Sequence, residues 1–234
     1  MDKIYKQKWD AAKEYIGERV ETNVCLGQYN SHHIQNDLKH FMISMSRYKF
    51  VAKMIKYKKS CNVLEIGCGE GLGGRMFVQE ADIKTYMGVD IDESAIDWAR
   101  DNMMRTDLPL EYMVGDVFDE RLLVNRKYDV AFSLDVIEHI ERVSEELFIK
   151  SICEKLNEDG CCVIGTPNIT MSEYASETSK IVHINLYTHK RLYELLDKFF
   201  ENVFMFSMND EVISTGFEPM ACYIFAVGAG LKNR

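Results

Sequence analysis

Three side chains that can exchange protons or bind a metal ion stand close together at Asp135, Glu138 and His139. If this segment is helical, their spacing places all three on one face. One role is general-base catalysis by His139, because a free imidazole titrates near neutral pH. A second is a divalent cation held by all three, which would lower the pKa of a bound hydroxyl group. A third is structural, with both acids near a helix N-terminus, where negative charge is favoured.

His183 is a further candidate, and it lies between two apolar residues in the sequence IVHIN at 181–185. It lies between the fifth apolar run and the next helical pattern, and a catalytic role and a structural role both stay open. Two more histidines, His32 and His33, could belong to a lid over such a site. They lie in the polar segment GQYNSHHIQ at 27–35, which predicts a loop or a cap between helices.

A glycine-rich segment, VLEIGCGEG at 63–71, begins with an apolar run and continues through Gly67, Gly69 and Gly71. Glycine lets the backbone approach a ligand closely because it has no Cβ. Residues 69–74 also fit the dinucleotide pattern GxGxxG. In that pattern the first glycine ends the strand, whereas here Gly67 ends it two residues earlier. The register therefore fits a dinucleotide site poorly.

Two acidic residues follow the next apolar runs, Asp90 in GVDID and Asp116 in GDVF. An acid at the end of the second strand can accept hydrogen bonds from both hydroxyl groups of a ribose. An acid after the third strand can accept from the exocyclic amine of an adenine, with Val117 and Phe118 against the ring. Asp92 suits a helix N-cap better than Asp90 does. These residues predict a nucleoside site.

Apolar runs alternate with helical patterns from residue 62 onward, whereas the first sixty residues are helical in pattern. This alternation predicts a parallel sheet with helices on both faces. The last two runs have no helix between them and predict an antiparallel hairpin at the sheet edge. Seven strands are expected, at 63–66, 86–89, 111–114, 130–133, 161–165, 203–206 and 222–227. Helices are expected at 74–79, at about 93–102, after the fourth strand, and at 189–200.

Together these stretches resemble the class I S-adenosylmethionine-dependent methyltransferases. The glycine motif, GVDID and GDVF match that family in order, followed by YDVAFSLDVIEHI at 128–140 and LNEDGCCVIGTPN at 156–168. The resemblance covers about residues 45–230. It implies a Rossmann-like α/β domain over 61–234 with seven mostly parallel strands, covered by an N-terminal helical lid over 1–60 that belongs to the same domain. The cofactor-binding residues that it implies are Arg47, Glu65, Gly67, Cys68, Gly69, Gly71, Asp90, Ile91, Asp116, Val117 and Leu134.

Within that superfamily, SLDVIEH at 133–139 is similar to the ubiquinone-biosynthesis O-methyltransferases and to related sugar and antibiotic enzymes. In that group an arginine before the glycine motif binds the cofactor carboxylate, which implies this role for Arg47. Some quinone O-methyltransferases hold a divalent cation, such as Mg²⁺, with an acid-x-x-Glu-His set, and Asp135 here replaces their glutamate with a shorter side chain. Alternatively, His139 packs against the cofactor. The implied acceptor is a hydroxylated or anionic metabolite, such as a quinone-like phenol or a sugar- or nucleotide-linked polysaccharide precursor.

The composition of the 234 residues limits the classes of molecule that the chain is expected to bind. A net charge of −9 disfavours nucleic acid, whose backbone needs clustered Lys and Arg. Seven cysteines without a CxxC pair indicate neither a disulfide framework nor a zinc site, and no apolar run reaches membrane-spanning length. We therefore expect a cytoplasmic enzyme that acts on a small molecule. The alternatives are a nicotinamide-dependent oxidoreductase and a non-catalytic cofactor-binding protein on the same fold.

Overall fold

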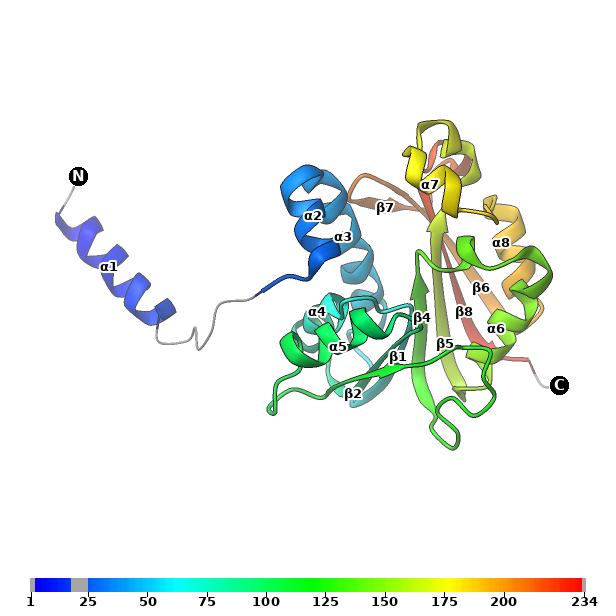
Figure 1. Ribbon diagram of the computed structural model, residues 1–234, viewed down its shortest axis with the longest axis horizontal. Coiled ribbons are helices and arrows are strands. Elements are labelled where there is room, and N and C mark those ends of the chain that lie inside the picture. The colour runs from blue at the N-terminus through cyan, green and yellow to red at the C-terminus, as the bar shows by residue number, and fades with distance from the viewer. Residues whose placement is uncertain (1–2, 18–24, 233–234) are drawn as a thin grey trace.

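One mixed β-sheet organises the chain, and its strands follow the apolar runs of the sequence (Figure 1). The computed structural model describes residues 3–17 and 25–232. Within these residues the strands are β1 (Cys61–Ile66), β2 (Ile83–Asp90), β3 (Leu110–Val114), β4 (Tyr128–Leu134), β5 (Leu156–Pro167), β6 (Phe200–Asn209), β7 (Val212–Ser214) and β8 (Tyr223–Leu231). They lie in the order β3-β2-β1-β4-β5-β8-β6-β7. The first five strands of this order, β3, β2, β1, β4 and β5, are parallel to one another. The pairs β5-β8, β8-β6 and β6-β7 are antiparallel.

This arrangement confirms the predicted Rossmann-like fold class, including the antiparallel pairing of the last two predicted strands. The sheet also has a strand that was not predicted. It is β7, whose residues pair with the end of β6 between Ser207 and Asn209. A strand of three residues with two exposed side chains leaves no apolar run by which a sequence reveals it.

Helices and short 3-10 turns connect the strands. The α-helices are α1 (Lys3–Gly17), α2 (Gln28–Asn36), α3 (Leu38–Ile55), α4 (Leu72–Glu80), α5 (Glu93–Asn102), α6 (Glu145–Cys153), α7 (Glu177–Val182) and α8 (His189–Leu196). The 3-10 turns are η1 (Ile137–His139), η2 (Arg142–Ser144), η3 (Ile169–Tyr174) and η4 (Glu218–Met220). The segment after β4 was expected to enter a helix directly, but it first forms η1 and η2, and α6 begins only at Glu145.

Each face of the sheet buries its own apolar core, because successive side chains of a strand point to opposite faces. On one face Val63 of β1 packs in a cluster with residues of α3, α4 and α5. On the other face its neighbour Leu64 packs in a cluster with residues of α6 and α8. Helix α3 contributes Val51 and Ala52, both fully buried, so residues 38–55 share a core with the sheet.

Residues 27–35, predicted as a loop or a cap, instead form most of helix α2. That prediction was wrong because the amide groups at the start of α2 are capped by a carboxylate from the glycine-rich turn, about forty residues away in the chain. The described part of residues 1–60 contains α1, α2 and α3, whereas residues 1–2 and 18–24 lie outside it, and the assignment of this region as a lid stays a prediction. Across 3–17 and 25–232, every helix is too short or too polar to traverse a lipid bilayer.

The glycine turn between β1 and α4 needs glycine for two separate reasons. Gly69 and Gly71 both adopt left-handed backbone conformations, with φ of +49° and +75°. At Gly71 a Cβ would also lie 2.7 Å from the Tyr112 ring, whereas at Gly69 it would meet nothing within 4 Å. The Tyr112 hydroxyl donates to the Gly71 carbonyl at 2.7 Å, which ties the turn to β3.

This difference predicts that Gly71→Ala destabilises the fold more than Gly69→Ala. Both alanines carry a left-handed backbone strain of about 1–2 kcal/mol. Only the methyl group at position 71 collides with a buried ring, which adds roughly 1–3 kcal/mol. Urea unfolding of both variants without ligand measures the two losses, and equal losses would contradict the tight packing at Tyr112.

Candidate active site

A cavity of about 1120 Å³ opens at the carboxyl ends of β1, β2, β3 and β4. These parallel strands end along one edge of the sheet, which is where open α/β sheets bind their ligands. Eight of the predicted cofactor-binding residues line it, and they are Gly67, Cys68, Gly69, Asp90, Ile91, Asp116, Val117 and Leu134. The other three, Arg47, Glu65 and Gly71, are not among the residues that line it. Their roles as cofactor ligands stay predictions.

Asp90 is fixed at the end of β2 by two backbone amides. Its Oδ2 accepts the N–H of Gly69 at 2.8 Å, and its Oδ1 accepts the N–H of Asp92 at 3.0 Å. The carboxylate is thereby joined to the glycine turn while each oxygen keeps a lone pair for a ligand. Asp92 caps α5 by accepting from Ser94 and Ala95, which confirms its predicted role as the helix N-cap, while the ribose contact of Asp90 stays a prediction.

The acid after β3, Asp116, is oriented in a similar way. Its Oδ1 accepts the N–H of Phe118 at 2.9 Å, in the turn that follows the strand. Asp116, Val117 and Phe118 all line the cavity, so a carboxylate and an apolar surface face the same space. This combination suits a flat base with an exocyclic amine.

Glu65 is fully buried beneath the glycine turn and hydrogen-bonded to the hydroxyl of Tyr86. Burial raises the pKa of its carboxyl group to about 8 from the usual 4.5, and the nearby charge of Asp90 raises it further while a hydrogen bond from Tyr48 opposes the shift. Its other oxygen, Oε1, has no hydrogen-bond partner. Glu65 is therefore protonated near neutral pH.

Arg47 projects from α3 to the turn after β4, where its Nη1 donates to Asp135 Oδ2 at 2.6 Å. The guanidinium also lies 3.9 Å above the ring of Tyr223. Asp135 has a φ of +57°, a left-handed conformation that turns its side chain toward α3. Asp135, but not Arg47, lines the cavity.

The turn after β4 separates the three residues that the sequence suggested as one set. Because η1 is a single 3-10 turn, Asp135 pairs with Arg47, whereas Glu138 points into the protein. Glu138 is fully buried, and its Oε2 accepts the hydroxyl of Thr166 at 2.9 Å. Burial and the charge of Asp135 raise the pKa of Glu138 to about 8.

A different set of three comes together instead, formed by Glu138, His139 and His183. One potential ligand atom from each lies within 4.8 Å of the others. The two imidazole rings meet edge to face with centroids 5.0 Å apart. His139 Nδ1 is 3.0 Å from the carbonyl oxygen of Val182. Sequence reasoning named all three residues but missed their grouping, because no spacing pattern links His183 to the turn.

Part of the chain is similar in sequence to known methyltransferases. Residues 63–160 match the family model described as a methyltransferase domain. The ubiquinone biosynthesis O-methyltransferase of Pelagibacter ubique is 28% identical over 116 residues, which cover 50% of this chain and 46% of that protein. The chain thus spans about half the length of the curated relatives it matches.

Solved structures share the fold over most of the chain. The methyltransferase domain of bacterial CtHen1-C superposes with a TM-score of 0.65 at 18% identity, covering 80% of this chain and 98% of that one. The plantazolicin methyltransferase BpumL in complex with SAH gives a TM-score of 0.63 at 16% identity, with 88% and 90% coverage. The match over residues 63–160, together with the shared fold, supports a class I S-adenosylmethionine-dependent methyltransferase domain.

Helix α2 forms part of the cavity wall and is attached to the glycine turn. Glu70 accepts the backbone N–H of Tyr29 at 2.7 Å, and the backbone and side-chain N–H groups of Asn30 at 3.2 and 2.6 Å. Tyr29, His32 and His33 line the cavity, and the assignment of the two histidines to a lid stays a prediction. Sequence reasoning missed Glu70, because it follows the glycines without a pattern that pairs it with α2.

Buried Glu65 predicts that stability falls as the pH rises from about 5 to 8. The folded state keeps a proton that the unfolded chain releases above about pH 4.5, so the free energy of unfolding decreases across this window. In Glu65→Gln this decrease should shrink by on the order of 3 kcal/mol between pH 5.5 and 8. Urea unfolding at both pH values measures the change, with exposed Glu120→Gln as the control. An unchanged pH dependence in Glu65→Gln would show that Glu65 is ionised in the folded protein.

Proposed function

We propose that this chain transfers the methyl group of S-adenosylmethionine to an oxygen atom of a small molecule and releases S-adenosylhomocysteine. One observation carries the proposal. The glycine turn, the acids Asp90 and Asp116, and His139 all line a single cavity at the carboxyl edge of the sheet. A nucleoside-bearing cofactor and a group able to act on the acceptor would therefore share one cavity.

Each part of the cofactor has a counterpart in this cavity. Asp90 would accept the ribose hydroxyl groups, and Asp116 would accept the adenine amine while Val117 packs on the ring. The turn at Gly67 and Gly69 would carry the amino-acid part, where the backbone can approach closely. This placement directs the sulfonium toward the turn after β4, where His139 lies.

Methyl transfer is an in-line displacement in which the acceptor oxygen forms a bond to the methyl carbon as the carbon–sulfur bond breaks. The positive sulfonium is itself the activating group, so the protein must mainly position the acceptor and keep water out. A hydroxyl acceptor must also lose its proton. The groups around His139 are placed to favour that loss.

Glu138, His139 and His183 fit a divalent cation. Glu138 Oε1 is buried without a hydrogen-bond partner, although Oε2 has one in Thr166. The Nδ1 of His139 is engaged by the Val182 carbonyl, which leaves Nε2 free in the manner of a metal ligand. Two imidazoles and a carboxylate favour a later transition metal such as Co²⁺ over Mg²⁺. Such a cation would supply Lewis acidity that lowers the pKa of the acceptor hydroxyl group.

The acceptor that we propose is a hydroxylated small molecule, either a quinone-like phenol or a sugar- or nucleotide-linked precursor of a polysaccharide. The name of the Pelagibacter relative supports a phenol, and the net charge of −9 makes a nucleic acid a poor acceptor. The family match favours methyl transfer over the nicotinamide-dependent oxidoreductase. The remaining alternative is a non-catalytic protein that binds the cofactor. Such a protein would bind S-adenosylmethionine without converting it to S-adenosylhomocysteine.

Calorimetric titration tests the cofactor assignment. The chain should bind S-adenosylhomocysteine and show no binding of NAD. Asp90→Asn should weaken S-adenosylhomocysteine binding at least tenfold, because charge-assisted hydrogen bonds to the ribose contribute more than about 1.4 kcal/mol. Asp97→Asn, on the exposed face of α5, is the matched control. Binding of NAD, or equal affinities in the two variants, would contradict the assignment.

Cobalt binding tests the cation assignment without reference to turnover. Wild-type protein should bind one Co²⁺ with a visible absorption band of nitrogen–oxygen coordination. His139→Ala and His183→Ala should each lower this affinity more than tenfold, since each removes a ligand. His189→Ala is the control, because His189, the first residue of α8, contacts Glu218 and not the proposed cation site. If no Co²⁺ binds and turnover survives EDTA, the cation assignment is wrong. General-base catalysis by His139 then becomes the proposed route for removing the acceptor proton.

A further inference from the structure

His183 contacts His139 from a short connecting segment, residues 183–188, which lies between α7 and α8 (Figure 1). The backbone N–H groups of Ile184 and Asn185 both donate to the carbonyl oxygen of Glu138, at 2.9 and 3.1 Å. These bonds hold the segment against η1. A segment without regular secondary structure needs further contacts to hold a side chain at a fixed position.

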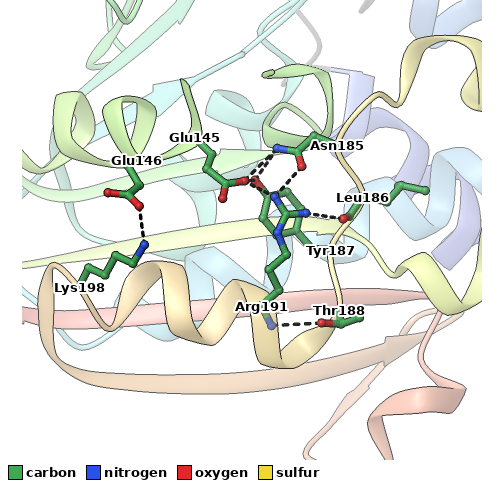
Figure 2. Close-up of polar contacts among 8 residues, drawn as sticks. All are labelled: Glu145, Glu146, Asn185, Leu186, Tyr187, Thr188, Arg191 and Lys198. Atoms are coloured by element: carbon green, nitrogen blue, oxygen red, sulfur yellow. Dashed lines mark hydrogen bonds and ion pairs between the residues drawn. The ribbon is translucent and has the colours of Figure 1, made fainter. Parts of the chain in front are cut away.

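Those contacts come from a polar cluster in which Glu145 and Arg191 bind Asn185 and Tyr187 of the segment (Figure 2). Arg191 pairs with Glu145 Oε2 through Nη2, and the same nitrogen donates to Asn185 Oδ1 at 2.6 Å. Its Nη1 donates to the carbonyl oxygen of Leu186 at 2.8 Å. One guanidinium therefore binds a side chain and a backbone group of the segment together, which the planar fork of arginine permits and an ammonium group does not.

Glu145, the first residue of α6, completes the cluster from the other side. Its Oε2 accepts from Asn185 Nδ2 at 3.1 Å and from the Tyr187 hydroxyl at 2.7 Å. The ring of Tyr187 lies 4.2 Å below the Arg191 guanidinium. Tyr187 is fully buried, and its carbonyl oxygen accepts the N–H of Ile169 at 2.9 Å, just past the end of β5. The cluster thus fastens the segment to α6, α8 and the sheet.

The neighbouring ion pair between Glu146 and Lys198 provides an internal comparison (Figure 2). It also connects the start of α6 to the end of the α8 region. Its side chains are 60% and 51% exposed, whereas those of Glu145 and Arg191 are 14% and 21% exposed. An exposed pair contributes little to stability, but a shielded pair with several hydrogen bonds is costly to break.

We propose that Glu145 and Arg191 are positioning residues that hold His183 opposite Glu138 and His139, without touching substrate or cofactor themselves. This inference rests on the proposed function, because it assigns the pair to the site in which a cation and the acceptor meet. Partners behind metal ligands typically change metal affinity by about 10–100-fold when they are removed.

The test compares Glu145→Gln and Arg191→Lys with the control Lys198→Gln, all in the full chain. Glu145→Gln keeps the side-chain shape but removes the charge, and Arg191→Lys keeps the charge but removes the fork. Both should weaken Co²⁺ binding by about 10–100-fold. They should leave the affinity for S-adenosylhomocysteine within about threefold, a difference of less than 1 kcal/mol. Lys198→Gln should change neither affinity.

Amide hydrogen exchange gives a second measurement that needs no metal. The N–H groups of Ile184 and Asn185 should exchange at least tenfold faster in Arg191→Lys than in wild type, and at the wild-type rate in Lys198→Gln. If wild type binds no Co²⁺ but these amides respond as expected, the cation proposal fails and the positioning role stands. Unchanged exchange at these amides in both cluster variants overturns the positioning role, as does a parallel loss of S-adenosylhomocysteine affinity.

Discussion

The parallel pairing of four strands is the constraint from which the active site follows. Strands β3, β2, β1 and β4 run in the same direction, so their carboxyl ends lie along one edge. The turns that leave this edge are short, and each places a different chemical group there. The turn after β1 presents glycine backbone, the turns after β2 and β3 present carboxylates, and the turn after β4 presents Asp135 and His139. The cavity exists because these turns share one edge.

The buried acids at this edge show how much the site depends on its surroundings. Glu65 and Glu138 both lie out of contact with water, and burial raises the pKa of each to about 8. Each also has one oxygen without a hydrogen-bond partner. Burying such groups is unfavourable unless they are protonated or paired. For Glu138, a cation bound together with the two neighbouring histidines would coordinate the unpaired oxygen and offset the cost of burying it.

Much of this fold is predictable from the chain alone because it depends on local patterns. Short apolar runs identified the strands, alternate glycines identified the turn after β1, and Asp92 was recognised as a helix cap. Contacts between distant residues were not predictable in this way. The pairing of Arg47 with Asp135 joins residues 88 positions apart, and the contact of His139 with the segment before His183 spans 43 positions. Helix α2 was missed because Glu70, which caps it, belongs to another motif.

A structure with S-adenosylhomocysteine and Co²⁺ bound tests the central claim most directly, namely that cofactor and acceptor chemistry meet in one cavity. The account predicts adenine beside Asp116, ribose hydroxyls on Asp90, and the sulfur directed toward η1. Anomalous density from cobalt should lie among Glu138, His139 and His183. A sulfur atom directed away from η1, or a ligand bound outside this cavity, would contradict the account.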